Sequence, residues 1–158
     1  MATYNRTVTG GGTVGHPSNA AVPYVVTSPV WDTADGGTGG DIIQLIDVPA
    51  DTMIVAGCLE VLEARGNGQI TMDIGFTGGD VDCFVDGSAC AAGFTPFLEA
   101  AVGASGSSAR MLTSADTIDA LILDGGSTGE SALRFRIHVC MVDVSVNPVE
   151  SATVSTGT

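Results

Sequence analysis

Alternating apolar and polar positions predict that this 158-residue chain is built from strands. The clearest pattern covers residues 41–74, where three apolar runs are separated by two turn signals. Pro49 ends the first run because proline has no N–H for a ladder, and Asp51 is suited to turn the chain. Asn67 and Gly68 tolerate the positive φ of a tight turn, so we expect a hairpin between the second and third runs.

The second run predicts a strand with one main apolar face. That face contains Met53, Val55, Leu59 and Val61, and Glu60 points the other way. Ile54 and Leu62 interrupt the alternation, so we expect both faces to be partly covered, one by the opposite sheet and one by a neighbouring subunit.

The last apolar run, residues 131–146, predicts the longest strand. Its core face holds Leu133, Phe135, Ile137, Val139 and Met141. After Met141 the apolar positions shift to Val142 and Val144, which predicts a bulge or a strand that leaves its own core to pack elsewhere. The predicted contacts between protomers are the four apolar residues outside the core period: Ile54, Leu62, Val142 and Val144.

Further strands are predicted at residues 22–27, where Pro23 indicates an edge, and at residues 116–124. Residues 88–110 lack a strand pattern and predict one long flap loop, with a short helix from Thr95 because Pro96 fits the first helical position. The 22 glycines favour many turns. We therefore expect an all-β fold, an antiparallel β-sandwich or a jelly-roll-like barrel.

The pattern divides the chain into three parts. Residues 1–20 are polar and glycine-rich and predict a flexible N-terminal arm, residues 21–147 the β-sandwich domain, and residues 148–158 a loose C-terminal tail. Residues 10–15 fit a G-x-G-x-x-G pattern, but the strand before it and the helix after it that a dinucleotide site needs are not predicted.

The net charge of the chain limits the classes of partner that it can bind. The formal net charge is −13, and the five basic residues are all arginine. A chain without a basic patch is a poor ligand for nucleic acid or for an anionic membrane. The acidity fits solubility, a salty medium, or docking onto a basic surface. Without an apolar run near ~20 residues or a signal peptide, the chain is expected to be made and used without export.

Candidate chemistry is sparse. Only His16 and His138 could serve a nucleophile as a base, and His138 in mid-strand is better interpreted as a satisfied strand-face histidine. Cys58 and Cys140 fit buried apolar positions, and a bond between Cys83 and Cys90 is not expected in a reducing cytosol.

Carboxylates leave two alternatives open. Asp80, Asp82 and Asp86 are close enough to suggest calcium, but their spacing is not that of an EF-hand, and solvated loop acids are the favoured interpretation. Paired carboxylates of a glycosidase remain an alternative, although few aromatic residues are present to form a sugar cleft. We expect no cofactor, no structural metal and no enzymatic activity.

The order of these elements resembles that of the head decoration, or capsid cement, proteins of tailed bacteriophages. The resemblance rests on Asp-Ile-Ile-Gln-Leu-Ile-Asp-Val-Pro-Ala-Asp-Thr-Met at residues 41–53, Leu-Glu-Val at 59–61, Met-Asp-Ile-Gly at 72–75, the Asp-rich turn at 80–87 and Ala-Asp-Thr-Ile at 115–118. It spans roughly residues 41–146.

The resemblance implies a non-enzymatic virion protein, made in the host bacterial cytoplasm, that binds the outer capsid surface. It implies the major capsid protein as partner, self-association as a homotrimer, and an arm carrying Tyr4 and Arg6 across coat subunits. A major coat subunit would be longer and have a prominent helix. The alternative is a carbohydrate-binding jelly-roll module of a head fibre or tail spike.

Overall fold

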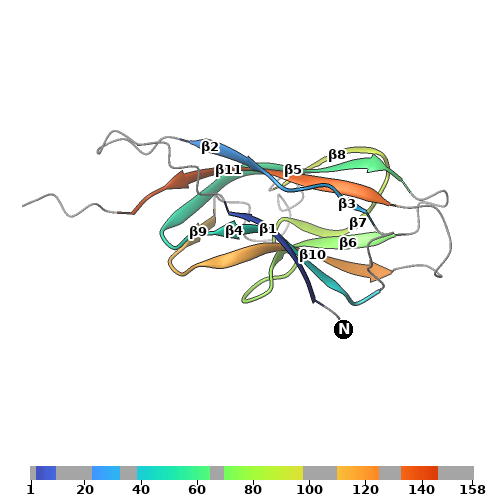
Figure 1. Cartoon of the computed structure of the whole chain (residues 1–158), viewed down its shortest axis with the longest axis horizontal. Helices are drawn as coiled ribbons and strands as arrows, with labels where there is room; N and C mark the ends of the chain where they lie inside the picture. Colours follow the sequence, from blue (N-terminus) through green and yellow to red (C-terminus); the bar gives the residue numbers. More distant parts are fainter. Residues whose placement is uncertain are drawn as a thin grey trace, which may run out of the picture.

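The structure, a computed structural model, describes residues 3–9, 23–32, 39–64, 70–97, 110–124 and 133–145, with backbone alone for 3–9 and 124. Every regular element among these residues is a strand. The strands form two sheets that lie one above the other (Figure 1) and are not closed into a barrel. The predicted all-β sandwich is therefore confirmed, and the barrel alternative is wrong.

The first sheet has five strands in the order β1 (Thr3–Thr9), β4 (Ile42–Val48), β10 (Asp116–Asp124), β6 (Thr71–Phe76) and β7 (Val85–Ala89). Its neighbours are antiparallel except for β1 and β4, which are parallel.

The second sheet has six strands. Its main path is β2 (Tyr24–Thr27), β11 (Arg134–Asp143), β5 (Thr52–Glu63) and β8 (Gly93–Pro96). Two shorter strands join it: β3 (Trp31–Asp32) pairs with β11, and β9 (Arg110–Leu112) pairs with β5.

Strand β1 lies where the sequence predicts a flexible arm. Residues 3–9 extend the first sheet beside β4, and the other arm residues lie outside the described part of the chain. The segment is rich in threonine and also contains tyrosine and valine, all of which favour strands, but its pairing partner lies far along the sequence. A local sequence pattern therefore cannot show that this segment pairs with β4.

The corner after β4 is found where the sequence places it. Strand β4 ends at Val48, Asp51 adopts a left-handed φ of 55°, and the chain then enters β5 in the other sheet. The predicted hairpin between β5 and β6 is wrong, because β6 returns to the first sheet. Asn67 and Gly68 themselves lie outside the described residues.

The irregular alternation of β5 has a local cause. Phe135 pairs with Val61 and Arg134 with Glu63, so Leu62 is an extra residue opposite β11. Cys140 pairs with Ala56 and Met141 with Ile54, so Val55 is a second one. Each bulge exchanges the two faces of the strand, which turns Ile54 rather than Val55 into the core. The irregularity predicted near Met141 is found at this point of the ladder, but the extra residue belongs to β5 and not to the last strand.

The core fills the space between the sheets and includes Trp31, Phe84 and Phe135. Phe84 stacks on Phe97, with ring centroids 5.2 Å apart, and meets the edge of Phe76 at 5.1 Å. Phe97 is buried at the end of β8, so the helix predicted to begin at Thr95 is wrong over its first residues. Its later residues lie outside the described chain.

One close approach fixes the turn between β6 and β7. The backbone of this turn lies over Gly75, where a Cβ would come within 2.3 Å of the Asp80 carbonyl oxygen. The Phe76 N–H donates to that same oxygen at 2.9 Å, and the Phe84 N–H donates to the Ile74 oxygen at 2.9 Å. Only glycine leaves room for this contact.

We therefore predict that Gly75→Ala destabilises the protein by about 1–3 kcal/mol, because the new methyl group must displace backbone. The matched control is Gly79→Ala in the same turn, where a Cβ meets nothing within 4 Å. Urea unfolding measures both. Equal stability of the two variants would contradict this packing.

Candidate functional site

A polar cluster occupies the outer face of the second sheet, away from the core. Glu60 Oε2 accepts a hydrogen bond from Arg136 Nε at 2.5 Å and forms a second hydrogen bond with His138 Nε2 at 2.9 Å. The other ring nitrogen, Nδ1, is 2.8 Å from the Thr27 hydroxyl. The cluster therefore joins the three adjacent strands β5, β11 and β2 across their outer face.

This arrangement binds the sheet together and offers no free base. Both nitrogens of His138 are engaged, which confirms its interpretation as a satisfied strand-face histidine. The Arg136 hydrogen bond is the main cause that lowers the pKa of Glu60. Cys58 pairs with His138 across the strands, but burial and then the Glu60 charge raise the pKa of its thiol. A raised pKa leaves little nucleophilic thiolate.

The cysteines differ from the expected placement. Cys83 and Cys90 are buried, and desolvation raises their pKa to about 11 and about 12. Cys58 and Cys140 are half-buried on the outer face rather than in the core, because the bulges set which β5 and β11 residues point inward. All four thiols are free.

The four predicted interface residues fall in different places. Ile54 lies fully inside the core, which leaves it no surface for a partner, and Val142 is also buried. Val144 is half-buried, and Leu62 is 41% exposed at its bulge. The side chains of Tyr4 and Arg6 lie outside the described part of the structure.

Three exposed apolar side chains on the second sheet were not predicted. They are Val25 on β2, Phe94 on β8 and Met111 on β9, which are 69%, 68% and 57% exposed. Val25 pairs with Cys140, Phe94 with Glu60 and Met111 with Met53, which places all three on the outer face. One of them, Phe94, comes from the predicted flap at residues 88–110, where no strand pattern indicates the direction of a side chain.

Charge is distributed unevenly between the sheets. The described basic side chains, Arg110, Arg134, Arg136 and His138, all belong to β9 and β11 of the second sheet. Arg134 pairs with Asp32 at 3.7 Å and Glu63 at 4.0 Å, so the carboxylates of this outer face have cationic partners.

The first sheet has no described basic side chain to balance its acids. Its strands and turns carry Asp47, Asp73, Asp80, Asp82, Asp86, Asp116 and Asp119. Arg110 reaches across from the second sheet to Asp80 at 3.3 Å. Asp80 and Asp82 interact, which lowers the pKa of Asp80 and raises that of Asp82. No group of three metal-ligating side chains occurs among the described residues.

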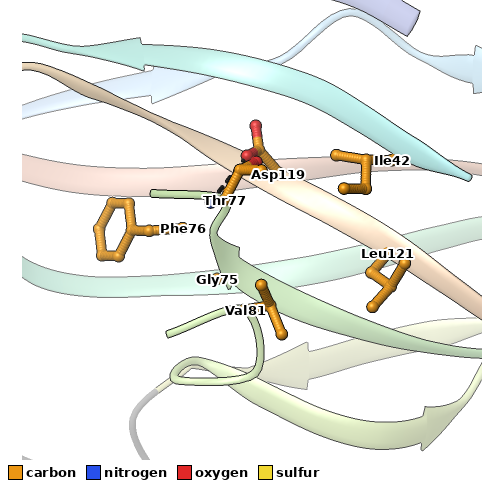
Figure 2. Close-up of a pocket in the computed structure, with 7 residues that line it drawn as sticks. All are labelled: Ile42, Gly75, Phe76, Thr77, Val81, Asp119 and Leu121. Carbon is orange, nitrogen blue, oxygen red and sulfur yellow. Dashed lines mark hydrogen bonds between the residues drawn. The ribbon is translucent and has the colours of Figure 1, made fainter. Parts of the chain in front are cut away.

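The outer face of this acidic sheet contains a shallow pocket (Figure 2). It holds about 170 Å³ of space, part of it open to solvent, and is lined by Ile42, Gly75, Phe76, Thr77, Val81, Asp119 and Leu121. The pocket lies beside Gly75, which pairs with Asp119 and is covered by the backbone of the turn. Its walls are mainly apolar.

Asp119 is the one ionisable residue of the pocket lining. It is 4% exposed, because Ile118 and Ala120 point into the core and Asp119 points outward beneath the turn. The Thr77 N–H donates to Asp119 Oδ2 at 3.0 Å. The other oxygen, Oδ1, is buried and has no hydrogen-bond partner of normal geometry among the described residues.

Burial raises the pKa of Asp119 to about 6. The Thr117 hydroxyl and the Thr77 N–H partly offset this, and the Asp116 charge adds to it. The folded state thus binds a proton more readily than the unfolded chain, whose aspartates titrate near pH 4. The penalty for the buried charge is full above about pH 6 and disappears as the pH falls below about 4.

Asp119→Asn should therefore raise the free energy of unfolding by about 2 kcal/mol at pH 7, and the gain should vanish near pH 4. Chemical denaturation of wild type and variant at several pH values measures the difference. Asp86→Asn, on an exposed residue of β7, makes the same charge change and is expected to show no such gain. A gain of equal size at both pH values would contradict the assignment.

Comparisons with known proteins identify the fold through structure alone. No family model and no curated protein match the sequence. A chain of the capsid asymmetric unit of cyanophage Pam1 is similar with a TM-score of 0.61 at 13% identity, covering 81% of this chain and 89% of that one.

Two further capsid structures agree. A chain of the acid-stable capsid of Helicobacter pylori bacteriophage KHP30 gives a TM-score of 0.57 at 15% identity, covering 77% of this chain and 88% of that one. A chain of the capsid of Ralstonia phage GP4 gives 0.57 at 20% identity, covering 79% and 87%. The resemblance to phage head proteins is thus confirmed at the level of the fold. Within the described residues, no helix is suited to crossing a membrane.

Proposed function

We propose that this chain is a structural protein of a tailed-phage virion that binds the outer surface of the capsid and stabilises it. The observation that carries the proposal is the shared sandwich: each of the three capsid chains is covered over 87–89% of its length. Because likeness at such low identity concerns the fold, the role rests on the surfaces as well.

The surfaces support a binding role rather than catalysis. Among the described residues, the one histidine-centred cluster is fully engaged, and Asp119 has no second carboxylate lining its pocket. The described residues are all strand and turn, whereas a longer chain with a prominent helix is expected of a shell-forming coat subunit. A compact sandwich can instead attach to a shell that another protein has built.

The exposed apolar side chains of the second sheet support association between copies of this chain. Chains of charge −13 repel one another, and bringing two first sheets together would place acid against acid. The outer face of the second sheet presents Val25, Phe94 and Met111 beside carboxylates already paired with Arg134 and Arg136. It is the described surface on which copies meet at least electrostatic cost. A homotrimer is the expected assembly.

Purified protein should bind expanded capsids that lack it and raise the temperature at which they open. Co-sedimentation and thermal release of DNA measure the two effects. Binding to glycans without binding to capsids would overturn the proposal in favour of a carbohydrate-binding module.

Phe94→Ser together with Met111→Ser should shift the protein from oligomer to monomer, because each serine removes an exposed apolar contact. The control is Leu123→Ser, which removes a 45% exposed leucine from β10 of the other sheet. Light scattering gives the mass of each. A monomeric wild type, or equal loss in the control, would show that the outer face of the second sheet is not the interface.

A further inference from the structure

The pocket beside Asp119 lies on the opposite face of the sandwich from Val25, Phe94 and Met111 and is not needed for association there. We propose that this pocket is a socket for the ammonium group of a lysine side chain from the coat protein. This inference rests on the proposed function for the identity of the partner, but the ligand chemistry is argued from the pocket itself.

A buried carboxylate oxygen that accepts no hydrogen bond is stabilised when a ligand supplies a hydrogen-bond donor. Asp119 Oδ2 accepts a hydrogen bond from the Thr77 N–H, whereas Oδ1 is buried and has no partner of normal geometry among the described residues. Leaving such an oxygen unsatisfied costs free energy, and a charged donor compensates it better than a neutral one. An incoming cation would also offset the charge that burial disfavours.

The apolar lining of the pocket determines which kind of cationic side chain fits. Ile42 and Leu121 are cross-strand neighbours on the outer face, and with Val81 they form an apolar part of the pocket lining on one side of Asp119 (Figure 2). Such walls suit the methylene stem of lysine. A guanidinium fork prefers two free carboxylate oxygens, but only Oδ1 is free, so a single ammonium fits better.

Charge complementarity favours a partner that is basic. The chain contains no lysine of its own, and the charged side chains that are described on this sheet are all carboxylates. Its field attracts cations and repels a second copy of this chain. Because Asp119 is 4% exposed, the exposed turn residues Thr77 and Val81 must shift for the ligand to enter.

Protonation of Asp119 makes binding of an ammonium group depend on pH. With a pKa of about 6, Asp119 is ionised at pH 7 and becomes neutral on acidification. Asp116 is the charged neighbour that acts on it, and the remaining lining residues do not titrate. Ammonium binding should therefore weaken as the pH falls below about 6.

The direct test uses n-propylammonium as the probe and the Thr77 amide as the reporter in NMR spectra of the full chain. We expect a saturable shift at pH 7 that tetramethylammonium does not produce, that fades below about pH 6, and that Asp119→Asn abolishes. No response in wild type would overturn the socket, because a water molecule then suffices for Oδ1.

The partner is tested separately with capsids lacking this protein. Asp119→Asn should weaken binding by about tenfold or more, whereas Asp86→Asn should bind nearly as wild type, since a buried charge-assisted contact outweighs an exposed one. Normal binding by Asp119→Asn would overturn the coat protein as the source of the lysine. Weaker binding without a propylammonium response would show that Asp119 only holds the turn, which also overturns the socket.

Failure of the proposed function itself gives a different result. In that case wild type would not bind capsids at all, while the Thr77 amide would still respond to propylammonium. The socket would then stand with a partner other than the coat.

Discussion

The pairing of β5 with β11 determines the rest of this structure. It is the longest ladder in the molecule, running from Arg134 opposite Glu63 to Asp143 opposite Thr52. Its two bulges in β5 decide which side chains enter the core and which form the Glu60 cluster outside. Strands β2 and β3 pair with β11, and strands β8 and β9 pair with β5, so the whole second sheet is built around this pair.

Local signals predicted those features that depend on neighbouring residues. The end of β4 before Pro49, the corner at Asp51, the bounds of β10 and the irregularity near Met141 each follow from turn chemistry or a change of period. Sheet membership did not follow, because β5 and β6 separate into different sheets through pairing with distant strands. Asp119 could not be identified because its burial depends on the turn folding over Gly75.

The bulges also explain the misplaced interface. Ile54 and Leu62 both break the alternation, yet one enters the core and the other reaches solvent, since each lies at a different point of a bulge. The exposed apolar residues instead occur on the short strands β2, β8 and β9. Their direction is fixed by the partners they pair with, so sequence period alone could not reveal it.

The sandwich thus separates two kinds of surface, an acidic sheet and an apolar sheet with paired charges. We interpret the first as the face toward a basic coat surface and the second as the face between copies of this chain. The structure of the assembled particle tests this most directly. We expect density for this chain outside a shell made by another protein, with the outer face of β4, β10 and β6 against that shell. Finding the chain as the shell itself, or finding none of it on the particle, would contradict this assignment of the two faces.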